Sequence, residues 1–314
     1  MTAESDFHAL LVAIASDPAA RGLADDTAVL PVGGRSLVLT KDMLVEGVHY
    51  LPGDPPQDVA WKLVAVNLSD LAAKGARPLA ILLGYALGDE AWDRAFAAGL
   101  RTALDAFACP LLGGDTVSAR GARTLSLTAI GEADGPVPAR AGAQQGDDLW
   151  VSGTIGDAGA GLAILTGALH GPDALVRRYR APRPRLEAGQ ALAPLVTAMM
   201  DVSDGLLIDA SRLATASGIG VAISLDAIPL SDPYLATLGD DRAARLRAAA
   251  AGDDYELLFA APKDARHRIV EAGESLALPL TRIGVCTGGA GLSLTDADGP
   301  VPLPDSLGWE HDRG

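Results

Sequence analysis

Aspartates recur where apolar segments of this chain end. The stretch MMDVSDGLLIDAS, residues 199–211, places Asp201, Asp204 and Asp209 among apolar neighbours. Comparable turns with Asp occur in LADDTAVL, LTKDMLVEGVHY, NLSDLAAKGA, LLGGDT and AGDDYELL. Aspartate is disfavoured in strands, and a buried carboxylate without a partner is costly. A fold that gathers these turns in one place therefore needs cations between them.

Carboxylates that converge in this way favour a hard divalent cation, above all Mg²⁺. Mg²⁺ is usually held by one or two carboxylates together with waters and substrate phosphates. The two glycines before Asp115 permit a close approach of the backbone to a phosphate. Read alone, Ser203 or Asp204 would simply cap a helix that runs to Ser217. The recurrence of the pattern instead predicts an Mg²⁺ site shared between the two halves of the chain.

The net charge of −15 argues against nucleic acid as a partner, because such a field repels phosphate backbones. No apolar run reaches the ~18 residues that a membrane span needs. The first residues show neither a basic segment nor a cleavage signature. Cys109 and Cys286 lie far apart in the sequence and are interpreted as two reduced thiols. We therefore expect a cytoplasmic protein that binds neither nucleic acid nor membrane.

The length of 314 residues favours two domains. The Gly- and Pro-rich segment 134–148 is the predicted boundary, with domains over 1–137 and 138–314. The segment PLLGGD, residues 110–115, is expected to be a short strand that breaks into a glycine turn. Helices are predicted over 6–16, 58–75, 89–107, from 157 onward, and over 263–276. Strands are predicted over 36–40, 78–87, 124–133, 149–153, 221–225, 253–262, 281–286 and 291–295.

Neither a Walker A sequence nor the protein-kinase motif set is present. An ordered set of other motifs extends from about residue 21 to residue 285. The set is DDTAVL, KDMLVEGVHY, AVNLSDLAAKGARP, LLGGDT, ARAGAQQGD, VSGTIGDAGAGLAIL, DVSDGLLIDASRLATASG and AGDDYELLF. It resembles the thiamine-monophosphate kinases of the aminoimidazole ribonucleotide synthetase superfamily.

This resemblance implies a fold and an activity. The fold would be α+β, with two domains of mixed sheets and helices packed on them. The active sites would lie at domain junctions, and the N-terminal domains would bind ATP and metal and form a homodimer. The activity would be direct in-line transfer of the γ-phosphoryl group of ATP to thiamine monophosphate, giving thiamine diphosphate. Because the acceptor is already a phosphate oxygen, Mg²⁺ and Asp side chains suffice without a Ser-His or Cys-His pair.

The resemblance also implies roles for single residues, matched motif by motif. Asp70 and Asp204 would be the catalytic residues. The implied metal ligands are Asp26, Thr40, Lys41 through its backbone, Asp42, Asp70, Asp115, Asp201 and Asp204. The implied ATP contacts are Gly114, Asp115, Arg140 and Ser203. The implied contacts to thiamine monophosphate are His49, Asp253 and Trp309.

Several of these residues have an ordinary structural alternative. Asp70 could cap a local turn, and His49 could be a surface residue after a strand. Arg140 could be a solvated charge in the linker. Trp309 lies in a predicted tail.

The chain also departs from the motifs it resembles. Lys41 replaces Thr or Ser, and an inward Lys41 side chain would put a cation where Mg²⁺ should bind. Ala24 replaces Gly, Lys74 replaces Met, and Asp253 replaces Glu. Two alternatives therefore stay open: an ATP-dependent phosphotransferase of the same superfamily with another small-molecule acceptor, or a non-catalytic nucleotide- or metal-binding relative.

Overall fold

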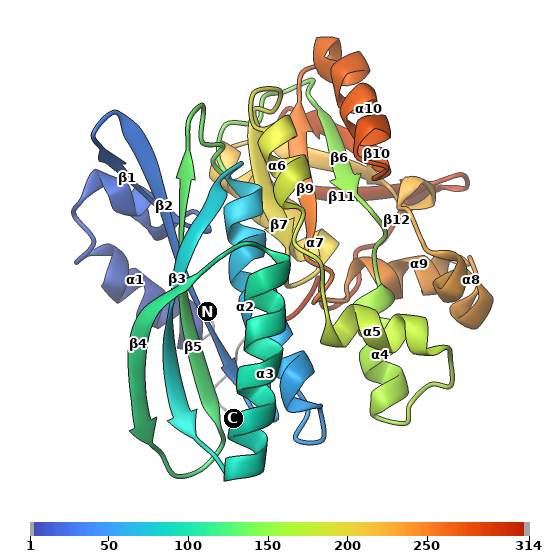
Figure 1. Cartoon of the computed structure of the whole chain (residues 1–314). Helices are drawn as coiled ribbons and strands as arrows, with labels where there is room; N and C mark the ends of the chain where they lie inside the picture. Colours follow the sequence, from blue (N-terminus) through green and yellow to red (C-terminus); the bar gives the residue numbers. More distant parts are fainter. Residues whose placement is uncertain (1–2, 311–314) are drawn as a thin grey trace.

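Two mixed sheets, one from each half of the chain, frame this computed structural model, which describes residues 3–310 (Figure 1). The first sheet has the strand order β1-β2-β5-β3-β4. Its neighbouring strands are antiparallel except β3 and β4, which are parallel. The strands are β1 (Ala28–Val32), β2 (Arg35–Val45), β3 (Arg77–Leu87), β4 (Leu111–Ser118) and β5 (Thr124–Ala133).

The edge strand β4 corrects one prediction. It continues through Gly113 and Gly114, so the expected glycine turn is wrong. A Cβ atom on Gly114 would lie 1.8 Å from the carbonyl oxygen of Leu83 on β3. The glycine therefore serves the close approach of two paired strands rather than a turn. Every residue of β4 is exposed to solvent in this chain.

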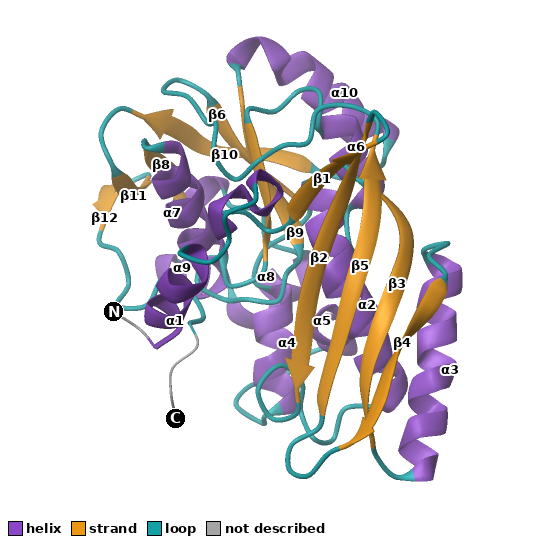
Figure 2. Ribbon diagram, turned by 90° about the vertical axis from the view of Figure 1, so that its left-hand side faces the viewer, coloured by secondary structure: helices purple, strands orange, loops and turns teal. Residues whose placement is uncertain are grey.

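Helices α2 (Pro56–Ala73) and α3 (Glu90–Ala106) pack on one face of the first sheet (Figure 2). They confirm the helices predicted over 58–75 and 89–107. Helix α2 contacts β2 and β5 on one side, and α6 (Leu186–Leu192) and β7 (Ala198–Val202) of the second half on another. Its Leu63 and Leu68 lie in one core with Leu125 and Leu127 of β5. Because α2 is enclosed in this way, polar residues on it face both halves of the molecule.

The second sheet has the strand order β12-β11-β8-β10-β6-β9-β7. Its strand pairs are antiparallel except β8 and β11, which are parallel. The strands are β6 (Asp148–Ser152), β7 (Ala198–Val202), β8 (Gly220–Ser224), β9 (Glu256–Ala261), β10 (Leu280–Thr287), β11 (Gly291–Asp296) and β12 (Gly299–Val301). The predicted strands of this half are confirmed, although β9 begins three residues later than expected.

Helix α7 (Leu206–Ser217) follows β7 and packs with it, so that Met200 and Leu207 share a core with Leu258 of β9. The helices not yet named are α1 (Ala3–Val12), α4 (Asp157–Leu165), α5 (Asp173–Arg180), α8 (Asp232–Leu238), α9 (Arg242–Ala249) and α10 (Arg266–Ser275). Short 3₁₀ helices are η1 (Pro18–Leu23), η2 (Leu225–Ala227) and η3 (Lys263–Ala265). Across residues 3–310, no helix combines the length and apolar character that a membrane crossing requires.

Candidate functional site

Carboxylates from both halves of the chain meet beside the C-terminal end of α2. Asp42 comes from β2, Asp70 from α2 and Asp201 from β7. Besides burial, the negative charges of Asp42 and Asp201 raise the pKa of Asp70. The negative charge of Asp26 raises the pKa values of Asp42, Asp70 and Asp201. Such mutual effects require proximity. We call Asp26, Asp42, Asp70, Asp201 and Asp204 the carboxylate cluster.

Burial is the largest cause of these raised pKa values. Burial, with the charges of Asp26 and Asp204, raises the pKa of Asp42 to about 6. Burial and the neighbouring carboxylates also hold the pKa values of Asp70 and Asp201 well above their usual range. Among the described residues, Asp42, Asp70 and Asp201 form no ion pair with Lys or Arg. Negative charge on Asp42, Asp70 and Asp201 is therefore not balanced by a Lys or Arg among the described residues.

Polar residues of α2 orient these carboxylates. The Ser69 hydroxyl donates a hydrogen bond of 2.6 Å to Oδ2 of Asp201. The Asn67 Oδ1 accepts the backbone N–H of Asp42 at 2.9 Å. Thr40 donates its hydroxyl hydrogen to Asp70. Asp70 thus faces the cluster, and the alternative of a local turn cap for this residue is wrong.

Asp26 has a different environment from the other members. Its carboxylate pairs with Lys74, 2.6 Å from Oδ2, and with Arg140. Burial opposes ionisation here, but the two cations hold the pKa of Asp26 below its usual range. Arg140 therefore lies in the cluster and is not a solvated linker charge. The Nε of Arg140 is buried and has no hydrogen-bond partner among the described residues.

The loop between β7 and α7 is held by a residue of the helix itself. Oδ2 of Asp209 accepts the backbone N–H groups of Ser203, Asp204 and Gly205 at 3.1 to 3.3 Å. The helix cap is Gly205, without a side-chain cap bond, so the predicted capping by Ser203 or Asp204 is wrong. Arg212 bonds both Asp204 and Asp209. Burial raises the pKa of Asp209 to about 7 although Arg212 opposes the shift.

The side chain of Lys41 does not enter the cluster. Residues alternate along β2, so Thr40 and Asp42 face α2 while Lys41 is exposed and donates to Ser126 of β5. Only the backbone of Lys41 can therefore serve a metal. The conflict expected from an inward Lys41 does not arise.

Gly114 and Asp115 lie apart from the cluster within one chain. Strand β4 is separated from β2 by β5 and β3. The Oδ1 of Asp115 accepts the N–H of Thr116 next to it. One chain alone thus does not bring Asp115 to Asp42, and the implied metal and ATP roles of Gly114 and Asp115 stay predictions.

Lys62, a buried residue of α2, connects two residues that are predicted to contact thiamine monophosphate, His49 and Asp253. Its Nζ donates to the backbone oxygen of His49 and to Oδ2 of Asp253, each at 3.0 Å. Nζ also lies 3.9 Å from the ring centre of Tyr179. Trp309 donates its backbone N–H to the carbonyl oxygen of Asp204 at 2.9 Å. The C-terminal segment, predicted to be a loose tail, therefore reaches the cluster.

The donor chemistry of the cluster fits Mg²⁺, because carboxylate, hydroxyl and backbone carbonyl oxygens are its preferred ligands. Over residues 3–310, no three Asp, Glu, His or Cys side chains are placed to hold one ion together. Mg²⁺ does not require this, since waters and substrate phosphates complete its shell around one or two carboxylates. The buried carboxylates without a protein cation, Asp42, Asp70 and Asp201, are the residues that can hold it.

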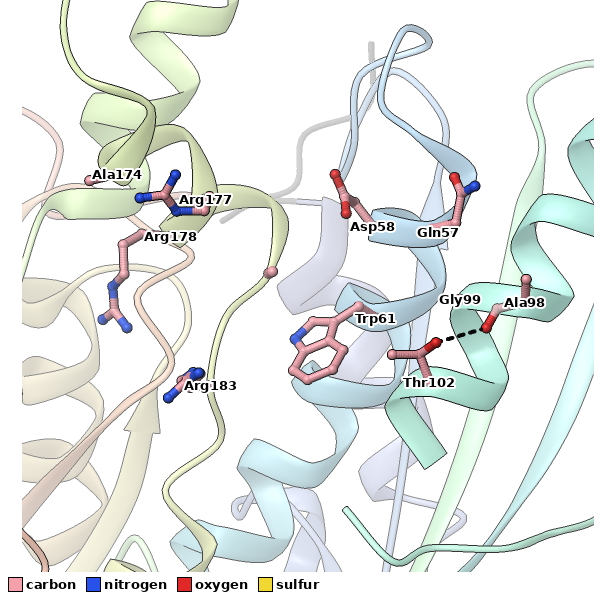
Figure 3. Close-up of a pocket in the computed structure, with 11 residues that line it drawn as sticks. Gln57, Asp58, Trp61, Ala98, Gly99, Thr102, Ala174, Arg177, Arg178 and Arg183 are labelled. Carbon is pink, nitrogen blue, oxygen red and sulfur yellow. Dashed lines mark hydrogen bonds between the residues drawn. The ribbon is translucent and has the colours of Figure 1, made fainter. Parts of the chain in front are cut away.

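A cavity of about 540 Å³ lies elsewhere, between α2, α3 and α5. Figure 3 shows Trp61 on the α2 side and Arg177 and Arg183 on the opposite side. None of the predicted site residues lines this cavity. It is therefore distinct from the carboxylate cluster.

Comparison with known proteins gives this geometry a family. Residues 24–133 match the family model of the AIR synthase related protein, N-terminal domain, and residues 144–297 match that of its C-terminal domain. The thiamine-monophosphate kinase of Caulobacter vibrioides is 41% identical over 304 residues, covering 94% of this chain and 86% of the relative. This chain belongs to the thiamine-monophosphate kinase family.

Solved structures of thiamine-monophosphate kinases share the fold. That of Stenotrophomonas maltophilia K279a has a TM-score of 0.78 and 39% identity, covering 90% of this chain and 93% of that one. The structure of AaThiL complexed with AMPPCP and TMP has a TM-score of 0.82 and 31% identity, covering 95% and 94%. These matches confirm the predicted α+β, two-domain architecture. The limits of the two domains at residues 137 and 138 stay predictions.

Four residues that orient the site of this thiamine-monophosphate kinase family member were not predicted: Lys62, Asn67, Ser69 and Lys74. All four lie on or directly after α2 and are buried. Polar side chains at buried positions of an apolar helix are unusual unless they are paired. That pattern is the signal in the sequence that could have identified them.

Proposed function

We propose that this chain catalyses the ATP- and Mg²⁺-dependent phosphorylation of thiamine monophosphate to thiamine diphosphate by direct in-line phosphoryl transfer. The observation that carries the proposal is the group of buried carboxylates without a protein cation, Asp42, Asp70 and Asp201. They come from both halves of a fold shared with thiamine-monophosphate kinases, one of which was solved with AMPPCP and TMP.

Asp42, Asp70, Asp201 and Asp204 would hold Mg²⁺, with Thr40 and the Lys41 carbonyl beside them. Bound there, Mg²⁺ would neutralise charge on the phosphate oxygens as the phosphoryl group transfers. Asp70 and Asp204 are the residues we assign to catalysis, through placement of this charge. The acceptor needs little proton removal, so no general base is required.

The two substrates would approach the cluster from different sides. The unpartnered Nε of Arg140 supports a contact to a nucleotide phosphate, since guanidinium groups bind phosphate strongly. The Ser203 loop lies near it, because Asp209, which accepts the Ser203 backbone N–H, interacts electrostatically with Arg140. His49 and Asp253, bridged by Lys62, would contact thiamine monophosphate. Trp309, whose backbone is tied to Asp204, would contact it from the C-terminal segment.

A homodimer through the N-terminal halves completes the proposal, supported by the fully exposed edge strand β4. Large apolar residues are also exposed on this sheet, among them Leu82, Leu112 and Val117. Such side chains commonly mark an interface. We place the reaction in the cytoplasm, where both substrates and Mg²⁺ would be available.

The test is to incubate the purified chain with ATP and Mg²⁺, with and without thiamine monophosphate, and to measure thiamine diphosphate by chromatography. We expect product only when all three components are present. Asp70→Asn should lower the rate at least about 100-fold, because charge placement of this kind commonly contributes that much. Asp298→Asn is the matched control, since Asp298 is a highly exposed carboxylate of the second half.

Two results would contradict the proposal. ATP binding that depends on Mg²⁺, without any thiamine diphosphate, would exclude thiamine monophosphate and direct the search to another acceptor. If the chain forms no product and also binds no ATP, it is a relative without this catalytic activity.

A further inference from the structure

Lys74, the residue that ends α2, is a fully buried lysine. The chain has only four lysines, and this one has no solvent exposure. Its Nζ lies 2.5 Å from Oδ1 of Asp25 and 2.6 Å from Oδ2 of Asp26, and donates to the Met199 carbonyl oxygen at 3.1 Å. The ammonium group therefore has one hydrogen bond, to Met199, and two carboxylates as ion-pair partners. A buried ammonium group is costly unless opposite charges of this kind are paired with it.

The position of Lys74 divides the carboxylate cluster into two sides. On one side, Lys74 and Arg140 neutralise Asp26, and Lys74 and Arg21 neutralise Asp25. On the other side, Asp42, Asp70 and Asp201 have no Lys or Arg partner among the described residues.

We propose that the Lys74 ammonium is a fixed cation that occupies one metal position of the cluster, at Asp26. Mg²⁺ then binds only at the other members of the cluster, Asp42, Asp70, Asp201 and Asp204. The motif that NLSDLAAKGA resembles has Met in place of Lys74, and a neutral side chain there would leave a cation position open at Asp26. Lys74 is thus a positioning residue, and Asp26 acts through it rather than as an Mg²⁺ ligand. This inference rests on the proposed Mg²⁺ site.

The contacts of Lys74 also connect the two halves of the chain. Lys74 joins Asp25 and Asp26 of the N-terminal segment to Met199 on β7 of the second half. The cation that it supplies is present before any metal arrives. The contact between the two halves at Lys74 therefore does not require a divalent ion.

The experiment counts metal ions on metal-stripped protein titrated with Mn²⁺, using electron paramagnetic resonance to measure free Mn²⁺. We expect Lys74→Met to bind one more Mn²⁺ per chain than the unaltered protein. Lys263→Met is the matched control, because Lys263 is exposed on η3 and its replacement makes the same change in net charge. This control should bind as many ions as the unaltered protein.

The outcomes separate the two proposals. If the unaltered chain binds no Mn²⁺, the proposed metal-dependent function fails. If it binds Mn²⁺ and Lys74→Met binds an equal or smaller number, only the role of Lys74 is overturned. A Lys74→Met protein that folds only with Mn²⁺ supports the role, because the ion has replaced the ammonium.

A second pair of variants covers the case in which Lys74→Met does not fold at all. Asp25→Asn removes one of the two carboxylates at Lys74, so the doubly altered K74M/D25N has less uncompensated buried charge. K74M/D25N should bind one more Mn²⁺ per chain than D25N alone. Equal numbers for these two proteins would overturn the role of Lys74.

Discussion

The Nζ of Lys62 on α2 lies 3.0 Å from Oδ2 of Asp253, in the loop before β9. Only 2% of the Lys62 side chain is exposed, against 29% of that of Asp253. The lysine is therefore the fixed partner, and the carboxylate is the one that a substrate can reach. Tyr255 also donates to Asp253, at 3.1 Å. Asp253 is thus oriented by two residues that the protein core holds.

Removing the Lys62 partner should weaken the use of thiamine monophosphate selectively. Lys62→Met is expected to raise the KM for thiamine monophosphate about tenfold, equal to about 1.4 kcal/mol. The KM for ATP should stay unchanged. The reason is that Asp253 loses its orientation while the carboxylate cluster is untouched. Steady-state kinetics with each substrate varied in turn measures the effect.

A double-mutant cycle with Asp253→Asn controls that prediction. Because the two side chains act as a pair, the effects of the single changes should not add. Additive effects, or an equal rise in both KM values, would show that Lys62 acts on stability or on the whole site.

Mg²⁺ should stabilise the protein more at high pH than at low pH. The pKa values of Asp42 and Asp209 are raised to about 6 and about 7 from the ordinary 3.8. Between the ordinary and the raised pKa values the folded chain binds protons that the unfolded chain has lost, so stability declines as the pH rises from about 4 to about 7. Without Mg²⁺ we expect the melting temperature to fall between about pH 4 and pH 7, as these two carboxyls contribute.

Mg²⁺ should reduce this fall, since the ion favours the ionised carboxylates that burial disfavours. Thermal melts at several pH values, with Mg²⁺ or with a chelator, measure both effects. Asp42→Asn should flatten the profile recorded with the chelator. An Mg²⁺ effect of the same size at every pH would contradict the prediction.

The adjacent glycines of β4 should tolerate a methyl group very differently. Gly114→Ala places a Cβ 1.8 Å from the Leu83 carbonyl oxygen, whereas the nearest atom for Gly113→Ala is Leu82 Cδ2 at 4.0 Å. We expect the first change to lower the melting temperature by about 5 °C or more, from strain of about 1–3 kcal/mol. Gly113→Ala should be close to the unaltered protein. Equal melting temperatures for the two variants would refute the proposed need for close approach.

The exposed face of the first sheet should carry the homodimer. Size-exclusion chromatography with light scattering is expected to give twice the chain mass of 32.0 kDa. Leu112→Asp should give a monomer, because Leu112 is 66% exposed on β4 and its replacement puts charge into the interface. Leu303→Asp, at a 43% exposed position of the second half, is the matched control. A dimer that persists in Leu112→Asp would place the interface elsewhere.

Several features could be predicted because they depend on local sequence. Helix α2 follows from the spacing of its apolar residues, and the strands of the second sheet follow from short apolar runs. The ordered Asp motifs were sufficient to indicate the family. They also identified Asp42, Asp70 and Asp201 as residues that would meet.

The orientation of side chains was harder to predict. The sequence left open whether the Lys41 side chain points into the metal site. In the structure Lys41 points outward, and Lys74 instead contacts the cluster. A shift of one residue along a strand moves a side chain to the other face, and the sequence alone does not specify that register.

The sequence by itself therefore determined the elements, the family and the chemical character of the site. Only the tertiary structure decided which cations balance which carboxylates. Lys62 pairs with a residue 191 positions away, and Lys74 joins the N-terminal segment to β7. Helix propensity acts over a few neighbouring residues, whereas a buried ion pair forms only when packing brings remote segments within about 3 Å and excludes water.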